Sequence, residues 1–231
     1  MTRSITAGRI NNAPSSVYYL PDFITPAEEQ ILIDKASGIV NEKGMIAESL
    51  PSWLSDMFPR FQESAVFDSL DATHRAPNHC LVNEYLPGQG IMPHKDGPAY
   101  LPTVATVSLS SHCVLEFYKV PEEEGEKGNQ DREVLSGSPS TTEEKQEPVF
   151  SLLVQPRSLL VLKEDVYNKY MHGIREITVD DLRKGNIVNI TEALPEGVVE
   201  SNALLERGTR ISLTFRIVQK TLSSKKIFLR R

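Results

Sequence analysis

The sequence predicts a mainly β domain, a sandwich or barrel with flanking helices packed on its outside. Two observations support this fold class. Two helix-like segments come early in the chain, and many short strand-like segments of alternating apolar and polar residues follow them. An apolar content of 39% over 231 residues is enough for one sizeable core. We therefore expect a single domain over residues 1–231.

The first helix is predicted from Pro26 to Ser37. Thr25 can cap it, and Glu28 can bond back to the Thr25 backbone N–H. Pro26 suits the first helical position, because a backbone N–H at that position would have no intrahelical acceptor. A second helix is predicted from Pro51 to Glu63, with a break at Pro59, because proline interrupts the helical hydrogen bonds.

Strands dominate the rest of the chain. Glycine- and proline-rich turns at residues 87–90 and 97–98 separate several of them. The expected strands are Ser16 to Leu20, His79 to Tyr85, Ile91 to Asp96, Thr103 to Ser111, His112 to Tyr118, Val149 to Val154, Ser158 to Leu162, Ile187 to Ile190 and Arg210 to Val218.

The acidic excess of the chain is confined to one segment. The formal net charge is −6, and residues 121–148 hold nine acidic and three basic residues, which accounts for all of it. The low apolar content of this segment predicts a disordered insert within one domain, which could dock another protein. Residues 220–231 form a basic tail that could contact phosphates or simply stay solvated. Net charge therefore gives no reason to exclude a nucleic acid partner.

Cysteine content and hydropathy indicate the cellular setting. Cys80 and Cys113 are too few for a disulfide scaffold and form no CxxC pair. No apolar run is long enough to cross a bilayer, and the first twenty residues are polar. We expect a monomer in the cytoplasm and nucleus, without a membrane partner.

A candidate metal site comes from three side chains. His94 and Asp96 lie two residues apart on a predicted strand, so both should emerge on one face. His172 is the best third ligand, although a histidine considered by itself in such a loop is more often a capping or hydrogen-bonded residue. Two histidines and one carboxylate form the facial triad of non-haem iron(II) oxygenases.

The last predicted strand alternates polar and apolar residues. Arg210, Ser212, Thr214 and Arg216 share one of its faces. This face could be exposed to solvent, as polar faces usually are. Alternatively, it could line a barrel interior, where arginines would bind a dicarboxylate through paired hydrogen bonds. Asn83 and Tyr85, two residues apart on another strand, could add hydrogen bonds to such a ligand.

Four motifs in this order resemble the AlkB family of Fe(II)- and 2-oxoglutarate-dependent dioxygenases. They are Asn83 to Gly88, His94 to Asp96, His172 to Ile174 and Arg210 to Arg216. The resemblance covers most of the chain outside the acidic insert, and it implies a double-stranded β-helix (jelly-roll) core.

The resemblance also implies a site and a reaction. Iron(II) would be held by the catalytic residues His94, Asp96 and His172, and 2-oxoglutarate by Asn83, Tyr85, Arg210, Ser212 and Arg216. The family couples conversion of 2-oxoglutarate to succinate and CO2 with oxidation of an N-alkyl group, which leaves as formaldehyde. The implied substrate is alkylated nucleic acid, RNA or DNA. The two arginines would neutralise the negative charge left by the iron, Asp96 and the co-substrate, as a dry interior requires.

One departure from the family pattern leaves the substrate open. Nucleic-acid-directed members carry aromatic and arginine residues between the first helix and the Asn-x-Tyr strand, whereas residues 38–49 contain neither. A protein side-chain hydroxylase or demethylase is therefore an alternative, as is a metal-binding module with an incompetent substrate pocket. The histidines His74, His79 and His112 are expected to have structural roles, and Trp53 is expected to pack in the core.

Overall fold

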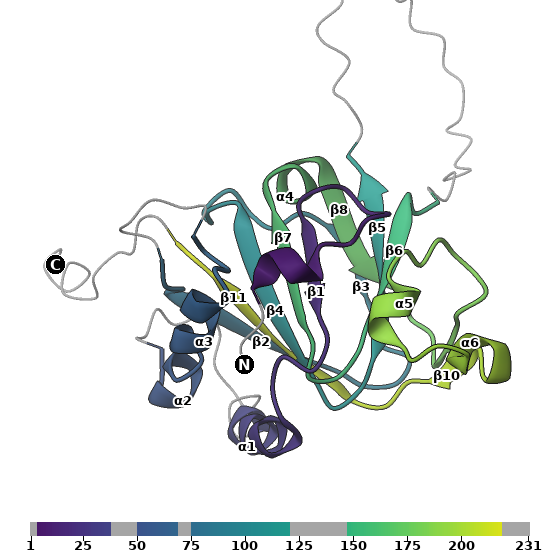
Figure 1. The fold of residues 1–231 in the computed structure, drawn as a ribbon, viewed down its shortest axis with the longest axis horizontal. Coiled ribbons are helices and arrows are strands. Elements are labelled where there is room, and N and C mark those ends of the chain that lie inside the picture. Colours follow the sequence, from purple (N-terminus) through teal and green to yellow (C-terminus); the bar gives the residue numbers. More distant parts are fainter. Residues whose placement is uncertain (1–3, 38–49, 69–74, 121–146, 219–231) are drawn as a thin grey trace, which may run out of the picture.

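The computed structural model describes residues 4–37, 50–68, 75–120 and 147–218. Most of these residues belong to two antiparallel sheets that face each other (Figure 1). The acidic insert up to residue 146, the basic tail and residues 38–49 lie outside the described residues.

The larger sheet has five strands in the order β1-β7-β4-β11-β2, and the smaller has four in the order β3-β8-β5-β6. Along the chain from β2, the strands pass back and forth between the two sheets, which is the jelly-roll arrangement expected from the resemblance. In the larger sheet the strands are β1 (Val17–Leu20), β2 (His79–Tyr85), β4 (Thr103–Leu109), β7 (Leu159–Lys163) and β11 (Arg210–Arg216). In the smaller sheet they are β3 (Ile91–His94), β5 (Cys113–Lys119), β6 (Phe150–Val154) and β8 (Tyr170–Ile174). A separate two-stranded ribbon joins β9 (Val179–Asp181) to β10 (Leu204–Glu206).

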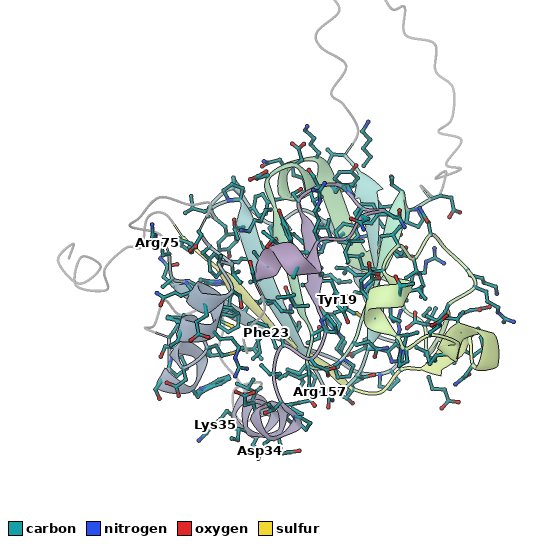
Figure 2. The ribbon with its side chains drawn as sticks, viewed as in Figure 1. Tyr19, Phe23, Asp34, Lys35, Arg75 and Arg157 are labelled. Carbon is teal, nitrogen blue, oxygen red and sulfur yellow. The ribbon has the colours of Figure 1, made fainter. Side chains whose placement is uncertain are left out.

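Three helices cover the outer face of the larger sheet: α1 (Pro26–Ser37), α2 (Ser52–Ser55) and α3 (Phe58–Glu63). The apolar side of β11 packs beneath them, with the rings of Phe61 and Phe215 4.9 Å apart. Asp34 and Lys35 extend from the opposite side of α1 (Figure 2). The remaining helices are η1 (Ile5–Gly8), α4 (Glu164–Lys169), α5 (Ile190–Ala193) and α6 (Val198–Ser201).

The predicted start of α1 is confirmed in detail. The backbone N–H of Thr25 donates to the Glu28 carboxylate at 2.7 Å, and the Glu28 N–H donates to the Thr25 hydroxyl at 3.2 Å. These reciprocal bonds satisfy two of the amide groups that a helix start leaves without intrahelical acceptors.

A second core lies between the two sheets, on the β1–β7 side. Tyr19 and Leu160 from the larger sheet meet Phe117, Phe150 and Leu152 from the smaller one (Figure 2 labels Tyr19). The Phe117 and Phe150 rings stack with their centroids 4.4 Å apart. Since this half of the interior is filled with apolar side chains, any polar site between the sheets must lie toward β11 and β2.

Two local predictions are wrong. The strand expected over Ile187 to Ile190 is reduced to one bridge between Ile187 and Ser151, and α5 begins at Ile190. The reason is Asn189, whose side-chain amide accepts from the Leu153 N–H and donates to the Leu153 carbonyl, which replaces strand pairing. The helix break comes before Pro59, because a proline is tolerated within the first turn of α3.

Among the described residues, none of the helices combines the length and the apolar character that a membrane span requires.

Candidate active site

The polar face of β11 lies in the interior between the sheets. Arg210, Ser212, Thr214 and Arg216 are all buried. The β2–β11 register places Asn83 opposite Ser212 and Tyr85 opposite Arg210, on the same side of the sheet. Of the two interpretations of this alternation, the one in which the polar face lines a barrel interior is therefore correct.

Arg210 marks one end of this polar strip. Its guanidinium donates to the Ser108 hydroxyl at 2.8 Å and lies 5.7 Å from the centre of the Tyr85 ring. The Asn83 amide donates to the Tyr85 hydroxyl at 3.4 Å, which links the predicted ligands to one another. Among the described residues, no carboxylate pairs with Arg210, and its buried Nε has no hydrogen-bond partner. A buried guanidinium needs an anion, so this end of the strip fits a carboxylate ligand.

His94 and His172 face each other across β3 and β8. They are direct partners in the strand register, and their ring centroids are 4.6 Å apart. Burial lowers the pKa of His172 to about 4, so its imidazole is neutral, which is the form that binds metals. Nδ1 of His94 lies 2.9 Å from the Met92 carbonyl; with the proton on Nδ1, Nε2 is free to bind a metal.

Asp96 reaches this region differently from the prediction. The strand expected to run to Asp96 ends at His94, after a register shift between Ile91 and His94. Alternation along a strand therefore does not place the His94 and Asp96 side chains. Instead, the buried Asp96 carboxylate forms an ion pair with Arg216, and its charge acts on His172, whose pKa it tends to raise.

In the described parts of the chain, no three His, Cys, Asp or Glu side chains are arranged so that they could hold a metal ion together. The structure brings the two histidines together and places Asp96 on Arg216. The chemistry of this donor set, two imidazoles with one carboxylate nearby, nevertheless suits iron(II), and the unpaired Arg210 suits an oxo-diacid. The residues present thus fit both groups.

Several residues of this interior were not singled out from the sequence. Ser108 supports Arg210, and Thr106 hydrogen-bonds Thr214 at 3.4 Å. Both lie on β4, where every second residue faces the same side, so the polar alternation from Thr106 to Ser108 was a usable signal.

A buried ion pair secures the segment that leads into β11. The Arg207 guanidinium donates twice to the Asp180 carboxylate, at 2.7 Å each, and once to the Arg175 carbonyl at 2.7 Å. Nε2 of His112 lies 3.3 Å from the same carboxylate, in keeping with its predicted structural role. Burial tends to raise the pKa of Asp180, but the hydrogen bonds from Arg207, together with the nearby His112 imidazole, outweigh it and hold this pKa below its usual value.

A jelly roll with two facing imidazoles, a buried carboxylate and buried arginines in its interior has the side chains of a non-haem iron(II) oxygenase. Residues 35–216 match the model of the family described as the 2OG-Fe(II) oxygenase superfamily. The chain therefore belongs to this family, and it is a dioxygenase.

A curated relative places the chain in the AlkB branch. It is similar to the "Probable RNA/DNA demethylase ALKBH6" of Danio rerio, with 38% identity over 92% of this chain and 90% of the relative. The AlkB resemblance of the four motifs is thereby confirmed.

Solved structures show the same fold. The structure described as OsALKBH1 matches with a TM-score of 0.50 and 13% identity, over 87% of this chain and 96% of that one. A prolyl-4-hydroxylase of Pseudomonas putida matches with a TM-score of 0.53 and 11% identity, over 96% of this chain and 97% of that one. At these identities the likeness concerns the fold, and it confirms the predicted jelly-roll core.

Proposed function

We propose that the protein demethylates N-alkylated nucleic acid oxidatively, with iron(II) and 2-oxoglutarate, and releases succinate, CO2 and formaldehyde. The observation that carries this proposal is the polar strip inside the jelly roll, with the unpaired buried Arg210 at one end and Arg216, paired with Asp96, at the other, together with the two facing histidines of the smaller sheet. The relative named as a probable RNA/DNA demethylase supports the choice of substrate.

Each residue of the strip has a proposed task. His94, His172 and Asp96 would hold iron(II). Arg210, with Tyr85 and Asn83, would bind the distal carboxylate of 2-oxoglutarate, while Arg216 and Ser212 would lie toward its other end. When bound, iron and 2-oxoglutarate use O2 to oxidise a C–H bond of the substrate.

The protein contributes charge and the exclusion of water. Arg216 lies against Asp96, where its positive charge offsets that carboxylate in a buried setting. The low pKa of His172 means that no proton must be displaced from its imidazole at neutral pH. The stacked rings of Phe117 and Phe150 close the interior on the side next to His172, whose ring lies 6.1 Å from that of Phe117.

The test is a mass-spectrometric screen of methylated RNA, methylated DNA and methylated peptides, with succinate measured in parallel. We expect loss of a methyl group from an oligonucleotide, dependent on iron and 2-oxoglutarate and abolished in His94→Ala. Met92→Ala is the matched control, because Met92 is on the same strand and is 79% exposed, and it should keep full activity. Full turnover in His94→Ala would reject the metal assignment.

A second candidate function is oxidation of a protein side chain. It is favoured by the sequence of residues 38–49, which contains no aromatic residue and no arginine. The peptide arm of the same screen tests it: a methylated peptide that is turned over in preference to every oligonucleotide would support this function against the first. Membership of an oxygenase family favours both enzymes over a non-catalytic metal-binding module.

A further inference from the structure

Three aromatic rings surround the Asp96–Arg216 ion pair, and the proposed chemistry uses none of them. His79, Tyr100 and Tyr167 form this group, which we call the ring cluster. The rings of His79 and Tyr100 are 5.3 Å apart, and the Arg216 guanidinium lies 4.9 Å from the centre of the Tyr100 ring. The Tyr167 hydroxyl donates to the Gly97 carbonyl at 2.9 Å.

The backbone around the ring cluster is tied down from several directions. His79 on β2 is the direct partner of Arg216 on β11, so their side chains are neighbours on the interior face. Tyr100 forms a bridge with Val218, and the next residue donates its N–H to the Ile217 carbonyl at 2.9 Å. Asn78 exchanges two hydrogen bonds with the backbone of Val218. The rings of His79 and Tyr100 are therefore held in place before any ligand arrives.

The ring cluster has unused binding capacity. All three rings are only partly buried, so each presents some surface. The Nδ1 atom of His79 is itself buried and has no hydrogen-bond partner, although such an atom is costly to leave unsatisfied. Burial, followed by the charge of Arg216, lowers the pKa of His79, so its ring is neutral and one of its nitrogens is an acceptor. A purely structural histidine would be expected to have found a partner.

The surrounding charge indicates which ligand would fit. A cationic methylated side chain would approach the positive Arg216 next to the Tyr100 ring, which disfavours a cation-binding aromatic cage. A planar heteroaromatic ring meets no such penalty, because it stacks on aromatic faces and offers polar edge atoms for hydrogen bonds. Residues 38–49 contain no aromatic residue that could supply such a face.

We propose that Tyr100 and His79 receive the target base of the nucleic acid, Tyr100 by stacking and His79 by a hydrogen bond at the accessible edge of its imidazole. This inference rests on the proposed function and names the substrate-binding residues of that site. It also replaces the structural role expected for His79.

The test compares Tyr100→Leu, which keeps apolar bulk, with Tyr100→Phe, which keeps the aromatic face. Binding of a fluorescent single-stranded RNA with one N6-methyladenine, an uncharged methylated base, is measured by anisotropy without iron. Stacking of one base is worth about 1–3 kcal/mol, so the Leu variant should bind about 5- to 150-fold more weakly. The Phe variant should stay within about twofold of the wild type, since the stacking face is unchanged.

A second readout separates substrate binding from support of Arg216. The apparent affinity of Tyr100→Leu for 2-oxoglutarate is therefore measured as well, from succinate formation without substrate, and it should fall by a much smaller factor than RNA binding does. If the apparent affinity for 2-oxoglutarate falls by the same factor as RNA binding, Tyr100 acts through Arg216 and the inference is overturned. It is also overturned if the Leu and Phe variants bind the RNA equally well.

His79→Phe tests the hydrogen bond separately from the ring. One neutral hydrogen bond contributes about 0.5–1.5 kcal/mol, so RNA binding should weaken about 2- to 13-fold. Unchanged binding would overturn the role of the His79 imidazole. The base-binding inference and the proposed function can fail separately. If the wild type demethylates peptides and no oligonucleotide, the proposed function is wrong. If the wild type demethylates RNA and Tyr100→Leu binds RNA as tightly as the wild type, only the base-binding inference is wrong.

Discussion

Replacement of Arg210 by methionine should separate stability from function. Arg210 is 6% exposed, and among the described residues it has no carboxylate partner. Methionine fills a similar space without a charge. Removing an unpaired buried charge stabilises, whereas losing the hydrogen bond to Ser108 costs about 1 kcal/mol. The two effects oppose each other, so the unfolding free energy without ligand should stay within about 1 kcal/mol of the wild type, or rise.

The response to 2-oxoglutarate should change much more. Hydrogen bonds to a charged group contribute about 1.5–3 kcal/mol, so losing the Arg210–carboxylate contact should raise the Michaelis constant for 2-oxoglutarate about 10- to 150-fold. Wild type at a hundred times its dissociation constant should gain about 2.7 kcal/mol from the ligand. At the same concentration Arg210→Met should gain only about 0.3–1.4 kcal/mol.

The assay is urea unfolding with and without 2-oxoglutarate and manganese(II), which replaces iron without turnover. Arg183→Met is the control, because Arg183 is exposed and pairs with Asp181 at the surface. It should leave the ligand response unchanged. Two results would refute the reasoning: a loss of several kcal/mol in ligand-free Arg210→Met, or an undiminished response to 2-oxoglutarate.

Three further predictions concern the buried ion pair, the helix cap and the basic tail. Asp180→Asn leaves the buried Arg207 without its counter-charge and should cost about 3–5 kcal/mol at pH 7. The pKa of Asp180 is lower in the folded than in the unfolded protein. The difference in unfolding free energy between wild type and Asp180→Asn should therefore be complete above about pH 4 and shrink as the pH falls through the folded pKa. Equal unfolding free energies in urea at pH 7 would contradict this prediction. Thr25→Ala should lower the unfolding free energy by about 1 kcal/mol in thermal unfolding, and Thr25→Ser, which keeps the capping hydroxyl, should lower it by much less. Equal losses of unfolding free energy in the two variants would exclude the cap as the cause. Removal of residues 220–231, which hold five basic residues, should lower the slope of log affinity for single-stranded RNA against log salt by up to about 3.5, and an unchanged slope would mean that the tail contacts no phosphate.

Elements with strong local signals were predictable from the sequence. The capping pair at Thr25 and Glu28 set the start of α1, whose bounds match the prediction at both ends. The alternation in β11 was correct, and so was the sorting of its side chains into two faces. Periodicity alone could not tell which face lies inside, because that depends on where the second sheet packs.

Features that depend on distant contacts were not predictable in this way. Strand β8, which carries His172, is only five residues long, contains a glycine and directly follows α4, so its pattern carries little information. Ser108 meets Arg210 across 102 positions of sequence. His79 and Tyr100 likewise come together only through the folded sheet, since no local rule pairs residues at that spacing.

The most direct test of the central claim is the product balance with a methylated single-stranded RNA. We expect one succinate and one formaldehyde for each methyl group lost, with both products and the methyl loss absent in His94→Ala and present in Met92→Ala. Turnover of 2-oxoglutarate that is never coupled to methyl loss from any RNA or DNA, but is coupled to oxidation of a peptide, would contradict nucleic acid demethylation.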